Sequence, residues 1–277
     1  MNAEHENSRR RVLRGAVATA MAGGILAAGA SGAAGAADAV DAAEAADPAD
    51  AADAPGTARV RVAILLYDGF TALDAVGPYE ILCRVPGVRV TTVAHRAGRI
   101  RTDTGQLALI AERPLAAVRT ADVLLVPGGG SGSIAATKDR ELLDWIRRIH
   151  RTTTWTTSVC TGSLILGAAG LLRGLPATTH WASRTYLTTF GAIYTPGRYV
   201  DAGKIITAAG VSAGIDMALH LASRLSTVRV AQAMQLATEY DPDPPYDTGT
   251  PEKADPELQA LALKLIADAA GQHRLTE

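Results

Sequence analysis

Short apolar runs of strand length alternate with longer segments of helical periodicity from about residue 59 onward. The runs typical of buried strands lie at residues 59–67, 88–95, 121–126 and 204–208. Segments with helical patterning lie at residues 68–85, 139–150, 212–225, 227–240 and 256–270. A polar turn at residues 104–106, flanked by residues 100–103 and 107–110, predicts a small hairpin.

This alternation of strands and helices predicts an α/β fold with βαβ units and right-handed crossovers. Near-continuous apolar runs such as residues 59–67 are typical of strands buried on both faces of a parallel sheet. In such folds ligands bind at the carboxyl ends of the strands. Polar residues that directly follow the strands are therefore the candidates for a functional site.

The clearest of these sites is a predicted strand, turn and helix around Cys160. A β-branched run ends at Cys160, and Thr161 and Gly162 lead into an Ala/Leu/Gly helical pattern. A side chain held on such an elbow projects from the sheet edge. The helix N-terminus favours a thiolate and would lower the pKa of the thiol, so Cys160 is a candidate nucleophile. The alternative interpretation is a buried structural cysteine.

The predicted strand at residues 121–126 is followed by one proline and then by Gly128, Gly129 and Gly130. The glycines lack the lysine and the spacing of a phosphate-binding loop. Backbone N–H groups of a glycine turn beside a nucleophile can hold a developing anion, so an oxyanion hole is one interpretation. The other is a plain strand-to-helix turn.

Two titratable side chains are candidates to assist Cys160. Asp74 follows the first strand, where a carboxylate is most often a helix cap but could hold or deliver a proton. His180, next to Trp181, could polarise the thiol or simply be packed. The remaining internal histidines fit strand or helix patterns, and no metal-binding spacing occurs, so we predict no metal site.

The N-terminal part of the chain differs in composition from the rest. Residues 1–36 contain Ser8 and the arginines 9–11 before a short Ala/Gly-rich apolar segment, which resembles a twin-arginine export signal. The segment is too weakly apolar to favour a membrane anchor. Residues 37–58 carry six acidic residues and no basic one, as in a disordered linker. We therefore expect an exported, extracytoplasmic protein whose folded domain spans residues 59–240, followed by an extension at residues 241–277 with one helix packing on the domain.

Charge and cysteine content restrict the function further. The formal net charge is −1, so no basic surplus suggests a nucleic-acid partner. The cysteines are Cys83 and Cys160. In an exported protein they could form a disulfide, but the twin-arginine route carries proteins folded in a reducing cytoplasm, which is compatible with free thiols.

Four motifs, taken together, resemble those of the ThiJ/PfpI family and occur in the same order. They are Leu73-Asp74 with Gly77-Pro78, Pro127-Gly128-Gly129, Ser158-Val159-Cys160-Thr161-Gly162 and Thr179-His180-Trp181. The likeness covers about residues 59–240 and implies a flavodoxin-like three-layer sandwich within the glutamine amidotransferase-like superfamily. Further likeness at residues 210–219 and 239–251 is to members that hydrate isonitriles.

The resemblance implies a hydro-lyase that adds water to an isonitrile and forms an N-substituted formamide through a covalent Cys160 thioimidate. It assigns Asp74 as the acid/base partner and Thr161 as a neighbour needed for activity, with the amides of Gly129 and Thr161 holding the anion. We expect Gly128, His180 and Trp181 to assist or to line the substrate pocket. The resemblance also implies a homodimer that needs no cofactor.

Some residues depart from other branches of the family. Thr161 stands where peptidase-like members have histidine, and Ala182 stands where amidotransferases have an acidic residue. Glyoxalase-like chemistry on small carbonyl compounds is an alternative, although Asp74 stands where many such relatives have glutamate. A second alternative is a non-catalytic module like the sensor domain of AraC-type regulators, but only about 37 residues follow Tyr240.

Overall fold

The computed structural model describes residues 60–272 of the 277-residue chain. The predicted export signal and linker lie outside the described residues. Two units can be distinguished along the chain, residues 1–53 and 54–277, and every described residue belongs to the second.

A seven-stranded sheet forms the middle layer, in the order β10-β11-β7-β6-β1-β2-β5. All neighbouring pairs are parallel except β10 and β11, which are antiparallel. The strands are β1 (Val60–Leu65), β2 (Val88–Ala94), β5 (Arg113–Pro114), β6 (Val123–Val126), β7 (Trp155–Ser158), β10 (Tyr199–Ala202) and β11 (Ile205–Ala208). The predicted hairpin is present as the antiparallel pair β3 (Gly98–Arg101) and β4 (Ala108–Ala111). A further short parallel pair is β8 (Pro176–Ala177) with β9 (Ile193–Tyr194).

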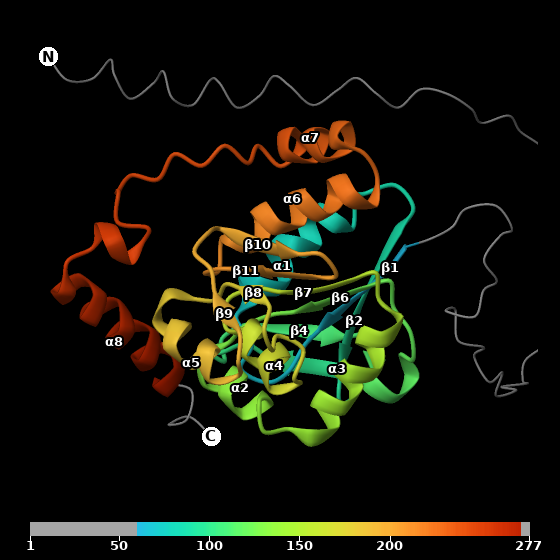
Figure 1. The fold of residues 1–277 in the computed structure, drawn as a ribbon, viewed down its shortest axis with the longest axis horizontal. Helices are drawn as coiled ribbons and strands as arrows, with labels where there is room; N and C mark the ends of the chain where they lie inside the picture. Colours follow the sequence, from blue (N-terminus) through green and yellow to red (C-terminus); the bar gives the residue numbers. More distant parts are fainter. Residues whose placement is uncertain (1–59, 273–277) are drawn as a thin grey trace, which may run out of the picture. The chain divides into compact units, whose positions relative to one another are not determined.

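Helices cover both faces of this sheet, which confirms the predicted α/β sandwich. Figure 1 shows α1 (Ala72–Leu82), α6 (Ala213–Leu225) and α7 (Val228–Ala237) on one side. The opposite side carries α2 (Gly130–Ala136), α3 (Arg140–Thr152) and α4 (Gly162–Ala168). Helix α5 is Arg184–Thr189, and short 3-10 turns lie at Leu115–Ala117, Trp181–Ser183 and Pro251–Lys253.

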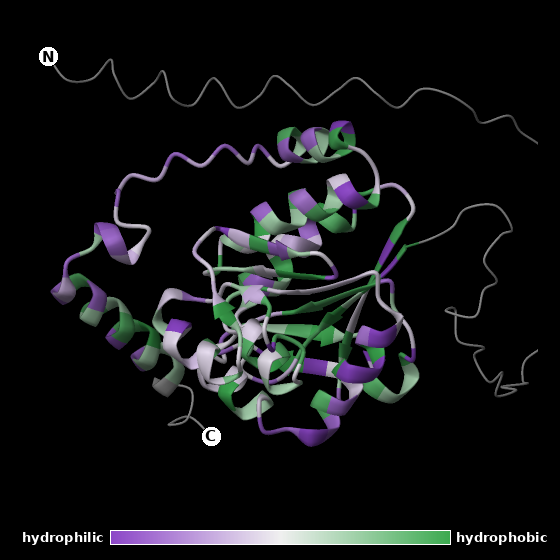
Figure 2. Ribbon diagram, viewed as in Figure 1, coloured by the Kyte–Doolittle hydropathy of each residue, from purple (hydrophilic) through white to green (hydrophobic). Residues whose placement is uncertain are grey.

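Apolar strands between amphipathic helices account for the core. All four residues of β6 are buried, and Figure 2 shows the strands as mainly hydrophobic while the outer faces of α3 are hydrophilic. Helix α3 buries Trp145 and Ile146 against the sheet, and Asp139 caps its start by accepting a hydrogen bond from the N–H of Leu142. Burial of such side chains contributes about 1.5–3 kcal/mol each.

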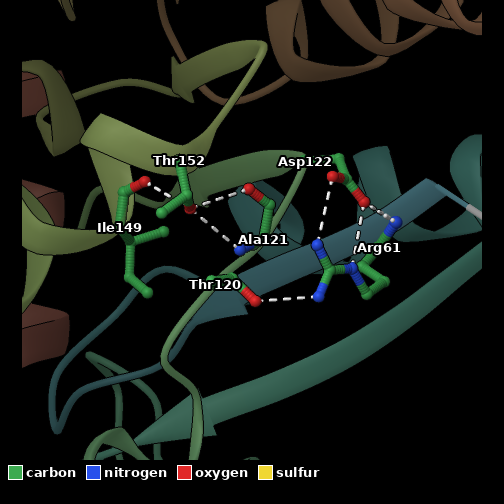
Figure 3. Close-up of polar contacts among 6 residues, drawn as sticks. All are labelled: Arg61, Thr120, Ala121, Asp122, Ile149 and Thr152. Carbon is green, nitrogen blue, oxygen red and sulfur yellow. Dashed lines mark hydrogen bonds and ion pairs between the residues drawn. The ribbon is translucent and has the colours of Figure 1, made fainter.

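A group of polar contacts joins the amino ends of the strands, the edge opposite the candidate site (Figure 3). The Arg61 guanidinium bonds to the carboxylate of Asp122 and to the hydroxyl of Thr120, linking β1 to the start of β6. The Thr152 hydroxyl pairs with the backbone of Ala121 at 3.2 Å, which ties the end of α3 to the same region. These contacts fix the strand register at the amino edge of the sheet. The loops of the candidate site lie at the opposite, carboxyl edge.

The C-terminal segment ends in α8 (Pro256–Gln272), which lies against α2. Asp255 caps this helix through the N–H of Leu258 at 2.8 Å. An ion pair of 2.9 Å between Arg184 and Glu252 connects the segment to α5. Within residues 60–272, none of the helices has the length and apolar character required to cross a membrane.

Candidate active site

The loops after β1, β6 and β7 meet at the carboxyl edge of the sheet. These three strands are neighbours, since β6 pairs with β1 on one side and β7 on the other. The loop after β1 leads into α1 and Asp74, the loop after β6 contains Gly128 and Gly129, and Cys160 follows β7. Sheet topology therefore brings together four residues that sequence analysis selected separately.

Cys160 has the backbone conformation of a nucleophile elbow. Its φ of 56° lies in the left-handed region, which non-glycine residues rarely adopt. Its N–H donates to the carbonyls of Ala208 and Ala209 at 3.1 and 2.8 Å. Its carbonyl accepts hydrogen bonds from the hydroxyls of Ser163 and Thr179, both at 3.1 Å. Four contacts thus hold the strained peptide in place.

Asp74 is fully buried beside this elbow. One carboxyl oxygen, Oδ2, accepts the N–H of Gly128 at 2.8 Å, whereas Oδ1 is buried with no hydrogen-bond partner. Burial raises the pKa of Asp74 from 3.8 to about 7, although the bond from Gly128 acts in the opposite direction. The side chain does not cap α1, because it bonds to the glycine loop instead. It is a carboxyl group that can gain and lose a proton near neutral pH.

The thiol of Cys160 is also buried, and burial raises its pKa well above the ordinary value. The negative charge of Asp74 raises it further, while hydrogen bonds from the N–H and hydroxyl of Thr161 lower it in part. The lowered pKa that the helix N-terminus alone predicts for this thiol is wrong, because desolvation outweighs the stabilisation of a thiolate by α4. At neutral pH the thiol needs a nearby base to become a nucleophile.

Gly128 lies between Asp74 and Thr161, where no side chain fits. A Cβ at this position would be 2.6 Å from the N of Thr161 and 2.8 Å from Oδ2 of Asp74. Such contacts require a shift of the backbone or of the carboxyl. The glycine therefore allows the β6 loop to approach both partners of Cys160.

The hydroxyl of Thr161 takes part in a buried chain of hydrogen bonds. It accepts the N–H of Gly129 at 3.0 Å and lies 2.7 Å from the hydroxyl of Ser133. Ser133 in turn lies 3.0 Å from the phenol of Tyr67, which donates to the carbonyl of Pro127 at 2.8 Å. The N–H of Gly129, predicted to hold an anion, is thus engaged by Thr161 in this structure.

Sequence analysis did not select Ser133 or Tyr67. Both are buried; Tyr67 lies at the sheet edge, two residues after β1, and Ser133 lies within α2. Tyr67 ends an apolar run, and Ser133 lies in a Gly/Ser-rich segment that looks like a loop. For Tyr67, a hydroxyl at the carboxyl end of a predicted strand was a signal, whereas for Ser133 the sequence gives none.

His180 and Trp181 lie close to each other, with ring centroids 5.5 Å apart. Burial and the charge of Arg184 lower the pKa of His180, which favours a neutral ring. Within the described part of the chain, His180 makes no hydrogen bond to Cys160; its neighbour Thr179 does. Trp181 lines a hollow with residues 248–251 and α8, so the C-terminal segment borders this side of the molecule.

The other predicted candidates lie in local contacts. His95, His150 and His220 bond to Asp139, Thr156 and Asp201, respectively, at 2.6–2.8 Å. Cys83 and Cys160 are both free, so the two thiols form no disulfide. Among residues 60–272, His, Cys, Asp and Glu side chains form no group of three that could hold a metal ion.

A cysteine on a strained strand-to-helix elbow, beside a buried carboxyl group in a mostly parallel sandwich, defines a class of cysteine-nucleophile α/β proteins. The DJ-1/PfpI family matches residues 60–224, which is more than half of the chain. The protein belongs to this family, and its flavodoxin-like fold agrees with the assignment.

Individual relatives support the same conclusion. An isonitrile hydratase of Pseudomonas putida is 43% identical over 209 residues, covering 75% of this chain and 90% of the relative. A crystal structure of a ThiJ/PfpI family protein from Pseudomonas syringae has a TM-score of 0.73 at 38% identity, covering 78% of this chain and 89% of that chain. Drosophila melanogaster DJ-1beta shares the fold, with a TM-score of 0.60 at 19% identity over 65% and 98% of the two chains.

Proposed function

We propose that this protein hydrates isonitriles to N-substituted formamides, with Cys160 as nucleophile and Asp74 as the group that moves the proton. The observation that carries the proposal is the buried pair of Asp74 and Cys160: the two side chains interact, and among the described residues the carboxyl oxygen Oδ1 has no other partner. Similarity to the Pseudomonas putida isonitrile hydratase supports the choice of substrate class.

The first step starts with one proton shared between Asp74 and Cys160: Asp74 is a carboxylate and Cys160 is a thiol. The Asp74 carboxylate accepts the proton of the Cys160 thiol, and the resulting thiolate attacks the terminal carbon of R–N≡C. Asp74 returns that proton to the same carbon, which gives the covalent thioimidate Cys–S–CH=N–R. The N–H and hydroxyl of Thr161 stabilise the transient thiolate, since both lower the pKa of the thiol.

The second step consumes one water molecule. Its oxygen adds to the thioimidate carbon, and a water proton goes to the imine nitrogen. The carbon–sulfur bond then breaks, the hydroxyl proton passes through Asp74 to sulfur, and R–NH–CHO leaves. We propose that the N–H and hydroxyl of Thr161 stabilise the negative charge that develops in this step. The N–H of Gly129 donates to that hydroxyl and holds it in place.

The experiment is to incubate the purified protein with a panel of alkyl and aryl isonitriles and to quantify formamides by nuclear magnetic resonance. We expect formamide from the parent and none above background from Cys160→Ala. Methylglyoxal is assayed in parallel. Hydration of methylglyoxal without any formamide would reject the proposal and favour the glyoxalase-like alternative.

The pH dependence follows from the proton count. Below pH about 7 Asp74 is protonated and cannot accept the thiol proton. We therefore expect kcat/KM to rise about tenfold per pH unit up to about pH 7 and then to level off. A pH series with one isonitrile measures this profile, and a kcat/KM that falls as pH rises through 7 would contradict the assignment of Asp74.

Export and assembly belong to the same proposal. We propose that the twin-arginine signal at residues 9–11 directs the protein out of the cytoplasm and that the mature protein is a homodimer. Cell fractionation of the parent beside Arg9→Lys/Arg10→Lys/Arg11→Lys tests export. Light scattering tests the dimer, with a monomer mass as the contradicting result.

A further inference from the structure

The buried hydroxyls of Tyr67, Ser133 and Thr161 form one continuous chain that ends at Cys160. Successive oxygens lie 3.0 Å and 2.7 Å apart, and a hydrogen bond from the Thr161 side chain lowers the pKa of the Cys160 thiol. At its other end the phenol of Tyr67 is 2.8 Å from the carbonyl of Pro127. None of the three side chains is more than 7% exposed, so water does not readily replace these partners.

Each hydroxyl has one proton to donate, which allows two complete arrangements of this chain. In the first, Thr161 donates to Ser133, Ser133 to Tyr67, and Tyr67 to the carbonyl of Pro127. In the second, Tyr67 donates to Ser133, Ser133 to Thr161, and Thr161 to the sulfur. The oxygen of Thr161 already accepts the N–H of Gly129, so its own proton goes either to Ser133 or to the sulfur.

The charge on sulfur decides between the two arrangements. A thiolate is a hydrogen-bond acceptor and favours protons that point toward Cys160, because bonds to a charged group are stronger than neutral ones. A neutral thiol or thioimidate lets the carbonyl of Pro127 compete for the Tyr67 proton. Ser133 is the link between them, since it alone bonds to both Tyr67 and Thr161.

We propose that Ser133 and Tyr67 are positioning residues that set the direction of the Thr161 hydroxyl and reverse it as Cys160 gains and loses its negative charge. This inference rests on the proposed function for its role in turnover. It adds two residues that act through Thr161 and determine how readily the thiolate forms.

The experiment measures alkylation of Cys160 by iodoacetamide as a function of pH, by mass spectrometry of the peptide containing Cys160. In Ser133→Ala, loss of the donor behind Thr161 should shift the alkylation profile upward by about one pH unit. Tyr67→Phe should shift it in the same direction and by less, because Ser133 can still donate to Thr161. If isonitriles are substrates, kcat should fall about tenfold in Ser133→Ala with little change in KM.

Controls separate this role from general destabilisation. Thr157→Val removes another fully buried hydroxyl, which bonds to the carbonyl of Leu124 instead of the chain, and should leave the profile unchanged. In the double variant, Tyr67→Phe should add nothing to Ser133→Ala. An unshifted profile in folded Ser133→Ala, or additive effects in the double variant, would overturn the inference. Because alkylation needs no isonitrile, the result stands apart from the proposed function.

Discussion

Asp74→Asn is expected to lower isonitrile turnover by about 10²–10⁴-fold and, at the same time, to make the protein more stable above neutral pH. Asparagine keeps an oxygen for the N–H of Gly128, so the loop geometry can persist. It cannot take the thiol proton or deliver it to carbon, which removes a general acid/base contribution of about 10²–10⁴-fold. Formamide release by the variant and the parent measures the loss.

The stability gain follows from the direction of the pKa shift. The folded state raises the pKa of Asp74 to about 7, whereas an unfolded aspartate titrates near 3.9. The protonated form is therefore favoured by folding, and this contribution is lost as pH rises through about 7. At pH 8 the buried carboxylate costs on the order of a few kcal/mol, and the neutral amide avoids that cost.

Thermal unfolding at pH 5 and pH 8 tests this expectation. The difference in Tm between Asp74→Asn and the parent should be larger at pH 8. The exposed Asp144, which pairs with Arg147, provides the control, because Asp144→Asn should change stability by no more than about 0.5 kcal/mol at either pH. A variant that is less stable than the parent at pH 8 would refute the assigned ionisation.

Gly162→Ala is expected to be the most damaging small substitution at the elbow. A Cβ on Gly162 would lie 2.1 Å from the carbonyl oxygen of Val126 and 2.8 Å from that of Pro127. Backbone atoms cannot move aside as a flexible side chain can, so α4 must move away from β6. We expect a loss of about 3 kcal/mol or more in the free energy of unfolding, together with loss of turnover as Cys160 is displaced.

Urea unfolding measures this effect. Gly249→Ala serves as the matched control, because a Cβ there meets nothing within 4 Å, and it should leave the urea midpoint nearly unchanged. If Gly162→Ala had the parent's midpoint, the close approach of α4 to β6 would not be a constraint on the fold.

The fold was predictable wherever burial dictates the sequence pattern. Strands β1, β2, β6 and β11 lie in the predicted segments, and every residue of β6 and β11 is buried, as expected of strands covered on both faces of a sandwich. The long helices followed from their amphipathic spacing. Two short helices were not predicted: α2, with the sequence GSGSIAA, and α5, with RTYLTT. Glycine, serine and threonine have low helix propensity, so packing rather than local propensity stabilises these two helices.

Only some residues of the candidate site could be predicted from the sequence. Cys160 and Asp74 could be selected because each follows a predicted strand, and parallel strands end at one edge. Ser133 could not, since its role depends on α2, a helix that the sequence does not signal. The pKa of Cys160 also required the structure, because a sequence indicates a helix N-terminus but not the depth at which the thiol is buried.

The central claim is that Cys160 forms a bond to the isonitrile carbon with the help of Asp74. The most direct test is intact-protein mass spectrometry of rapidly quenched mixtures of protein and isonitrile. We expect a transient gain of one isonitrile mass on the parent, mapped to Cys160 by peptide analysis, and no gain on Cys160→Ala. Formamide production by Cys160→Ala at the parent's rate, with no adduct on either protein, would contradict it.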